Sequence, residues 1–184
     1  MNKHAPVIAL NKKIQALGAE RQLQAAISTF RSIRSSGMYP TLVSYNVILY
    51  ACVRCGDLAT ARKLFEEQKA SAASNTSLSP NVITYTTMMK GFCSAGLMVD
   101  ASRLLKDMAE AEVAPNLRTI NMFLRGCLWH GNPDEALDCY TRIVKWALSP
   151  DRTSVDYTVR VLATGLRLNE ACDVLATVPK YITV

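Results

Sequence analysis

The chain has 184 residues, of which 49% are hydrophobic, and its net charge is +6 at neutral pH. This composition is sufficient for a packed core, while six cysteines without paired spacing exclude a disulfide scaffold and favour a reducing compartment. No uninterrupted apolar run has the length of a membrane span, so we expect no membrane-embedded segment.

The positive charge is concentrated near the N-terminus. Residues 1–41 contain six Lys and Arg residues and a single Glu, a net charge of +5, so the other 143 residues together carry only +1. A polyanionic partner such as nucleic acid would explain this distribution, and an ordinary solvated basic face is the alternative explanation.

One sequence pattern recurs five times. An alanine at the same place in each copy marks the period, which is 35 residues except for a step of 40 between the second and third copies. These alanines are Ala26, Ala61, Ala101, Ala136 and Ala171. In the third copy, apolar residues recur at i, i+3, i+4 and i+7 within residues 85–92 and again within residues 101–108. Each copy is therefore predicted to be two amphipathic helices.

In chain order, the predicted elements are an N-terminal tail, four helical pairs and a partial fifth pair. Residues 1–6 are the tail, residues 7–41, 42–81, 82–116 and 117–151 are the first to fourth repeats, and residues 152–184 are a partial fifth repeat with a C-terminal tail. The first and last repeats are degenerate. The second repeat holds five extra residues within about residues 70–78, whose Ser, Ala and Asn content predicts a lengthened loop.

Glycine and proline separate the predicted helices. Gly56, Gly96 and Gly131 are placed to close the first helix of a repeat, because glycine adopts a left-handed backbone without strain. In the segment GNPDEA, Asn132 is expected to cap the second helix. Four prolines are expected to stop the second helix of a repeat, and they are Pro40, Pro80, Pro115 and Pro150.

A pair of helices cannot bury its apolar stripe alone, so neighbouring repeats must stack. The expected fold is all-α, a right-handed α-solenoid of about five helix-turn-helix repeats. In the last repeat, Val161, Leu162, Leu166 and Leu168 are expected to form an exposed apolar surface that meets a second copy or a partner protein.

Neither a metal site nor a catalytic site is expected. Cys52 and Cys55 form a CxxC motif, but a zinc site needs two more ligands nearby, and the two histidines of the chain are His4 and His130. The cysteines are better explained as buried small residues. Asp57 is interpreted as a helix cap and not as a catalytic acid. We therefore expect no cofactor, no metal site and no enzymatic activity in these residues.

The recurring pattern resembles the pentatricopeptide repeat family. The segments VITYTTMMKGFCSAG and LVSYNVILYACVRCG, each followed by an alanine-centred helix and a PN ending, carry the resemblance. It extends from residue 7 to about residue 176 and is most specific between Leu42 and Asp151. It implies that the chain binds single-stranded RNA in a mitochondrion or chloroplast, about one base per repeat, and acts in RNA processing, stability or translation.

The family resemblance assigns base readout to the fifth and last residues of each repeat. The pairs are Asn11 with Thr41, Asn46 with Asn81, Thr86 with Asn116, and Asn121 with Asp151. An amide at the fifth position can donate and accept toward a pyrimidine, whereas a shorter Thr leaves room for a purine. The implied preference from 5′ to 3′ is pyrimidine, pyrimidine (C more than U), A, U. Capping of the following helix is the alternative role of the last residues.

Two further contacts follow from the same resemblance. The second residue of a repeat sandwiches a base, and these residues are Ile8, Val43, Ile83 and, as an arginine plane, Arg118. The thirteenth residue meets phosphate when it is basic. Only Arg54 fits, since Ala19, Ser94 and Trp129 hold this position elsewhere. Lys12 and Lys13 in the basic first repeat are expected to add phosphate attraction.

Two alternative functions remain. The shortage of basic residues at position 13 favours a structural subunit of an organellar ribonucleoprotein, such as a mitochondrial ribosome. The repeats also resemble the RNA-binding domain of protein-only RNase P, whose chemistry resides in a separate domain. The expected partners are therefore single-stranded RNA, other proteins of a ribonucleoprotein or a second copy of the chain.

Overall fold

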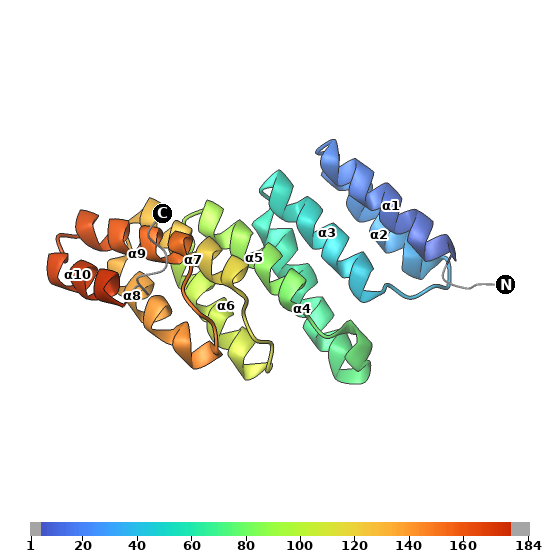
Figure 1. Ribbon diagram of the computed structural model, residues 1–184. Coiled ribbons are helices and arrows are strands. Elements are labelled where there is room, and N and C mark those ends of the chain that lie inside the picture. Colours follow the sequence, from blue (N-terminus) through green and yellow to red (C-terminus); the bar gives the residue numbers. More distant parts are fainter. Residues whose placement is uncertain (1–4, 178–184) are drawn as a thin grey trace. The chain divides into compact units, whose positions relative to one another are not determined.

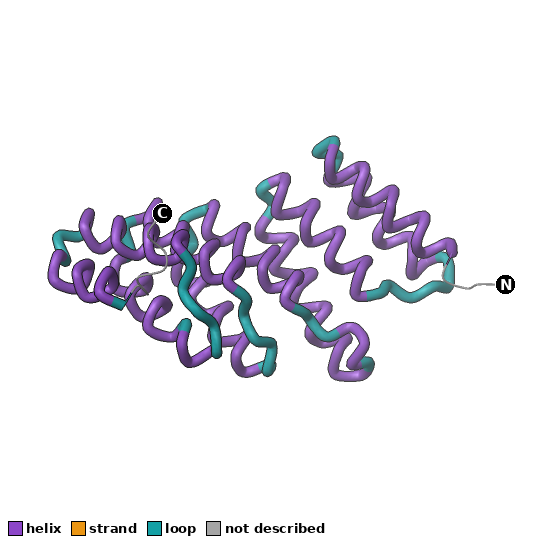
Figure 2. The backbone as a smooth tube through the Cα atoms, in the orientation of Figure 1, coloured by secondary structure: helices purple, strands orange, loops and turns teal. Residues whose placement is uncertain are grey.

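The computed structural model describes residues 5–177, which are helical throughout apart from the connecting loops and contain no strand (Figures 1 and 2). The α-helices occur as consecutive pairs: α1 (Ala5–Ala19) and α2 (Leu23–Ser35), α3 (Leu42–Cys55) and α4 (Leu58–Ser74), α5 (Val82–Ser94) and α6 (Met98–Glu110), α7 (Leu117–His130) and α8 (Pro133–Arg142), α9 (Arg152–Thr164) and α10 (Leu168–Ala176). Two short 3-10 helices, η1 (Thr76–Leu78) and η2 (Val144–Trp146), follow α4 and α8. The predicted all-α class is confirmed.

The chain divides into two compact units, residues 1–91 and residues 92–184, which we call the N-terminal and C-terminal units. In the N-terminal unit, α1 packs against α2 and α3, and α3 packs against α4. In the C-terminal unit, α7 packs against α8 and α9, and α9 also packs against α10. Helices therefore contact both their own partner and a helix of the next pair, as a stacked repeat requires.

The residues of the predicted apolar stripes form the core. All five alanines that mark the repeat are buried. In the N-terminal unit, two aromatic pairs join successive helical pairs edge to face. The ring centroids of Phe30 and Tyr45 lie 5.3 Å apart, and those of Phe65 and Tyr85 lie 5.6 Å apart.

The turn inside each helical pair needs a left-handed residue. Gly56, Gly96 and Gly131 supply it with φ values of 80°, 73° and 66°, as predicted. In the first and last pairs, Arg21 and Leu166 hold the same place with φ values of 59° and 58°. A residue other than glycine in this conformation costs about 1 kcal/mol. The first and last pairs therefore form the same turn with a less favourable residue than glycine.

Two predictions about loops and helix ends were wrong. The extra residues of the second repeat do not form a long loop, because α4 continues to Ser74 and η1 follows. The alanines in that segment favour helix, and Asn75 ends it and then accepts a hydrogen bond from the backbone N–H of Ser77. The prolines do not stop the second helices either. Each proline directly precedes the residue that caps the first helix of the next repeat. By that point α2 and α6 have already ended, at Ser35 and Glu110.

Two further expectations differ from the structure. Asn132 occupies the cap position of α8, but its side chain makes no capping hydrogen bond there. Val161 and Leu162 are fully buried rather than exposed, since α10 packs against α9. Leu166 and Leu168 are exposed as expected. These last two are therefore the part of the predicted apolar surface that water reaches.

The cysteines of the CxxC motif differ from each other. Cys52 is fully buried, as expected for a small core residue, whereas Cys55 is only half-buried. Burial raises the pKa of the Cys52 thiol to about 12, so this thiol stays protonated at neutral pH. Among the described residues, no helix combines the length and hydropathy of a membrane span.

Candidate functional site

The second residue of each of the first four repeats lies on the surface. Ile8, Val43 and Ile83 are 52%, 57% and 62% exposed, whereas the other large aliphatic residues of these helices are buried or half-buried. Arg118 takes the same place on α7 and is also exposed. These side chains present apolar surface to water at one recurring position, which suits contact with a flat apolar group.

The last residue of each repeat caps the next helix, which confirms the capping explanation. Thr41 accepts a hydrogen bond from the backbone N–H of Ser44 at 3.3 Å, and Asn116 accepts from Thr119 at 2.9 Å. Asn81 and Asp151 make the same contact at the starts of α5 and α9. A capping side chain is fixed in direction by the backbone, so any second contact it makes is oriented too.

In the N-terminal unit, a buried hydroxyl joins Asn46 to Asn81. The hydroxyl of Thr84 donates to Oδ1 of Asn46 at 2.6 Å and accepts from the backbone N–H of Asn81 at 3.2 Å. Oδ1 of Asn81 is occupied by the backbone N–H groups of Ile83 and Thr84, at 3.0 Å and 3.1 Å. The amide oxygen of Asn46 is therefore satisfied within the protein.

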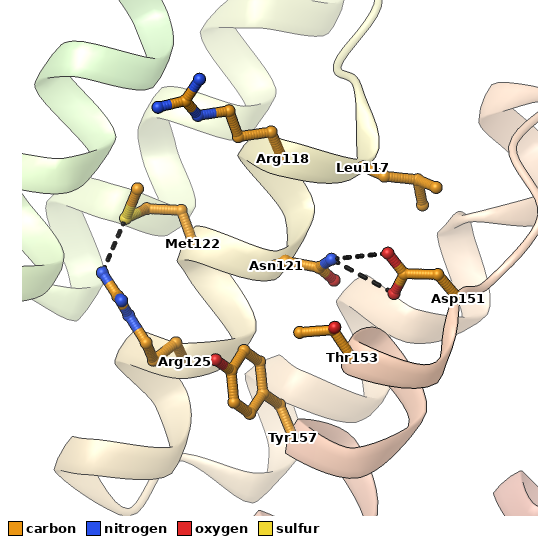
Figure 3. Close-up of a pocket in the computed structure, with 8 residues that line it drawn as sticks. All are labelled: Leu117, Arg118, Asn121, Met122, Arg125, Asp151, Thr153 and Tyr157. Carbon is orange, nitrogen blue, oxygen red and sulfur yellow. Dashed lines mark hydrogen bonds between the residues drawn. The ribbon is translucent and has the colours of Figure 1, made fainter.

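In the C-terminal unit, Asn121 and Asp151 contact each other directly (Figure 3). Nδ2 of Asn121 donates to the two carboxylate oxygens of Asp151 at 3.2 Å and 3.0 Å. A carboxylate only accepts, so it fixes the amide with its nitrogen toward Asp151. Oδ1 of Asn121 is then buried without a hydrogen-bond partner.

The Asn121–Asp151 pair lines a pocket of about 370 Å³. Arg118, Met122 and Arg125 from α7 and Thr153 and Tyr157 from α9 complete it, together with Leu117. Figure 3 shows the three α7 side chains on one side of Asn121 and Asp151 on the other. The pocket thus combines an unpaired acceptor, two guanidinium groups and an aromatic ring.

A second pocket of about 380 Å³ lies at the start of the N-terminal unit, between α1 and α3. Ile8, Asn11, Lys12, Thr41 and Val43 are among its lining residues, so the structure brings these five predicted residues together. Asn11 is only 7% exposed, and its Oδ1 is buried without a hydrogen-bond partner, as in Asn121. An unpaired buried acceptor is unusual, because its desolvation is not compensated.

The third predicted pair belongs to two different units, so its members are described separately. The hydroxyl of Thr86, on α5, donates to the backbone carbonyl of Val82 at 2.7 Å. Asn116 caps α7 and is exposed.

The predicted phosphate contacts are not equivalent. Lys12 and Lys13 are exposed on α1, and Lys12 lines the pocket beside Asn11. Arg54 donates to the backbone carbonyl of Ala19 at 3.2 Å, where it satisfies the end of α1. Arg34, another residue of the basic first repeat, pairs with Glu67 at 2.9 Å. Part of the N-terminal charge therefore serves the fold.

Sequence reasoning missed five residues of the C-terminal pocket, namely Leu117, Met122, Arg125, Thr153 and Tyr157. A helical signal was available, because Arg125 stands four residues after Asn121 and so lies one turn along the same face. No group of three His, Cys, Asp or Glu residues within residues 5–177 has the arrangement of a metal site.

Comparison with known protein families gives three matches that together span most of the chain. A model of the pentatricopeptide repeat domain matches residues 7–69, a model of the PPR repeat family matches residues 80–128, and a PPR repeat model matches residues 118–146. A chloroplastic pentatricopeptide repeat-containing protein of Arabidopsis thaliana is 26% identical over 136 residues, which are 71% of this chain and 17% of that protein. A mitochondrial one from the same plant is 28% identical over 137 residues, or 74% and 17% of the two chains.

Solved structures give a similar result. The crystal structure of the maize pentatricopeptide repeat protein PPR10 matches with a TM-score of 0.80 and 26% identity, covering 93% of this chain and 24% of that one. The same protein in complex with an 18-nucleotide psaJ RNA element matches with a TM-score of 0.72. The repeat domain of Arabidopsis protein-only RNase P 1 in complex with tRNA has a TM-score of 0.77 at 19% identity, covering 97% and 95% of the two chains, which shows a common fold. Both comparisons agree with the all-α repeat solenoid expected from the sequence.

Proposed function

The chain belongs to the pentatricopeptide repeat family, and we propose that it binds single-stranded RNA, one base per repeat, in a mitochondrion or chloroplast. Its first relatives carry chloroplastic and mitochondrial names, and PPR10 has been solved with bound RNA. The chain spans 17% of the length of the first of these relatives. The proposal therefore concerns the repeats themselves, which act here as a binding module without catalytic chemistry.

The observation that carries the proposal is the unpaired Oδ1 of Asn121 beside a pocket. An acceptor left unsatisfied in the protein costs about 1–3 kcal/mol, and an N–H donor on a ligand recovers this free energy. The terminal torsion of an asparagine side chain is soft, so a small rotation brings the oxygen toward an entering base. The pocket volume of about 370 Å³ suits one nucleotide.

The hydrogen bonds inside the protein also suggest which pyrimidine each amide selects. Uracil presents an N–H donor at N3, whereas cytosine presents an acceptor there. The nitrogen of Asn121 donates to Asp151, so its oxygen remains to accept a hydrogen bond from N3–H of uracil. The oxygen of Asn46 accepts from Thr84, so its nitrogen remains to donate to N3 of cytosine. The two amides therefore have opposite preferences although the residue is the same.

Apolar contact supplies the second part of the binding free energy. Exposed Ile8, Val43 and Ile83 lie at the positions where the family holds bases, and burying their aliphatic surface against a base face contributes in proportion to the area removed from water. With Thr86 leaving room for a purine, the preferred sequence from 5′ to 3′ is pyrimidine, C, A, U. We propose that the chain selects this core in an organellar transcript during RNA processing, stabilisation or translation.

The test is selection of RNA by the purified chain from a randomised single-stranded pool at moderate salt. We expect enrichment of a core of pyrimidine, C, A and U in the 5′ to 3′ direction. The same selection with Asn121→Thr should shift the last base from U toward G, because a shorter hydroxyl replaces the amide. Asn132→Thr is the matched control, since Asn132 lies outside the pocket on the same unit and makes no capping bond.

A pool without enrichment, or with duplex RNA held regardless of sequence, would contradict the proposal. The chain would then act as a structural subunit that grips a protein or a folded RNA. A shift of the last base in both variants would show that Asn121 does not read it.

A further inference from the structure

Two basic residues stand one helical turn beyond residues of the proposed base-reading set. Lys90 follows Thr86 by four residues on α5, and Arg125 follows Asn121 by four residues on α7. Residues four apart share one helix face, so each cation extends from the face that holds the reading residue. In the same two repeats, position 13, which the family uses for phosphate, is Ser94 or Trp129 and carries no charge.

Arg125 is held in an orientation that leaves its donors available. Its guanidinium carbon lies 4.7 Å from the ring centroid of Trp129, and its Nη2 donates weakly to the sulfur of Met122 at 3.3 Å. Stacking uses the face of the guanidinium, whereas the N–H groups that bind phosphate lie in its plane. Within residues 5–177, Arg125 makes no ion pair with a carboxylate.

The acidic group of the same pocket is already used. Asp151 accepts from Asn121 and from the backbone N–H of Ser154 at 2.7 Å. Its negative charge nevertheless disfavours a phosphate nearby unless a cation compensates. Arg125 and Arg118 lie on the opposite side of Asn121, as Figure 3 shows, so a nucleotide in the pocket would have its base edge toward Asp151 and its phosphate toward the arginines.

A similar contact occurs independently in the N-terminal unit. The ammonium nitrogen of Lys90 lies 5.7 Å from the ring centroid of Tyr50, and both side chains are exposed. Tyr50 is the ninth residue of its repeat, as Lys90 and Arg125 are of theirs. An aromatic ring thus holds the position-9 cation near the surface in both units.

We infer that Lys90 and Arg125 contact the RNA backbone phosphates in the third and fourth repeats, one helical turn from the position at which the family places this contact. This inference rests on the proposed RNA binding and adds the electrostatic part of it. It explains how repeats without a basic position 13 still neutralise phosphate. The two aromatic partners, Tyr50 and Trp129, orient the cations.

The test is the salt dependence of binding to a short single-stranded RNA that carries CCAU. Lys90→Met and Arg125→Met should each weaken binding to matched and mismatched RNA by the same factor. Each should also reduce the slope of log affinity against log salt by about 0.7, the value for one phosphate contact on a single strand. Arg125→Lys should restore the slope, whereas Asn121→Thr should change base preference and leave the slope unchanged.

Arg103→Met is the matched control, because Arg103 is exposed on the second helix of its repeat and lines none of the pockets described. A slope in Arg125→Met and Lys90→Met equal to that of the parent chain would overturn this inference while leaving base readout intact. Absence of RNA binding by the parent chain at low salt would overturn both the inference and the proposed function. Circular dichroism of each variant separates loss of contact from loss of fold.

Discussion

Asn46 and Asn121 occupy the same place in two repeats, yet their amides are engaged in opposite ways. In the N-terminal unit, the oxygen of Asn46 accepts from Thr84. In the C-terminal unit, the nitrogen of Asn121 donates to Asp151, and its oxygen has no partner. The difference follows from the group that reaches each amide, which is the donating hydroxyl of Thr84 in one case and the acceptor-only carboxylate of Asp151 in the other.

This comparison teaches that the last residue of a repeat can have two tasks at once. Asp151 caps the next helix, which fixes its direction, and it also determines which atom of Asn121 remains for a ligand. Capping alone would allow Asn and Asp equally, because both are good cap residues. The choice between them therefore carries information that helix stability does not require.

Thr84→Val should break the arrangement around Asn46 and have the largest effect on stability. The hydroxyl of this buried residue pairs with Asn46 and with the backbone N–H of Asn81, and valine leaves both groups unpaired. We expect a loss of about 2 kcal/mol in the free energy of unfolding, measured by urea denaturation. Thr87→Val is the control, since its hydroxyl bonds only within α5, and an equal loss there would contradict the explanation.

Asp151→Asn should convert the arrangement at Asn121 into the type seen at Asn46. The ratio of binding constants for U over C at the last base should fall by about tenfold, or about 1.4 kcal/mol, in competition binding with short RNAs. Because asparagine still caps α9, stability should change little. The reciprocal Asn81→Asp should move the second base from C toward U, and a uniform loss of affinity for all bases would disprove the assignment.

Asn11→Leu extends the comparison to a third amide, whose buried oxygen is unpaired. Leucine removes the unpaired group and favours helix more than asparagine does, so the free energy of unfolding should rise by about 1 kcal/mol. Asn46→Leu should destabilise instead, because the oxygen of Asn46 is paired. Thermal unfolding of both variants measures the difference, and a gain in both would show that pairing is irrelevant.

Asp57 is a carboxylate cap that belongs to none of the proposed base-reading pairs. Its substitution should have the smallest effect on stability. The backbone N–H of Thr60 donates to it at 3.0 Å and holds the pKa of this carboxyl below its usual value of 3.8. A lowered pKa stabilises the fold above pH 3.8, and this contribution is lost as the pH falls below that value. Asp57→Asn should remove a few tenths of a kcal/mol of this pH dependence, measured by urea denaturation between pH 5 and roughly pH 2.5. If the free energy of unfolding depends on pH in the same way in the parent chain and in Asp57→Asn, the carboxylate of Asp57 does not contribute to this dependence.

Much of the fold could be predicted because it depends on local patterns. A period of 35 residues, apolar positions at helical spacing and a glycine at the turn of the three middle pairs determine two helices per repeat and the residues that pack between them. The end of α4 was not predictable in the same way. A segment of Ser, Ala and Asn is compatible with loop or helix, and in the structure α4 continues through its alanines and packs against η1.

For the candidate site, the sequence by itself determined which residues recur at the second, fifth and last positions. It also determined that the last residues have the chemistry of caps. Only the tertiary structure decided that Val161 and Leu162 are covered, that Thr84 pairs with Asn46, and that Arg125 stacks on Trp129. These contacts depend on how the helices pack and on which rotamers the side chains adopt. Whether an amide donates or accepts depends on which group lies within hydrogen-bonding distance of it.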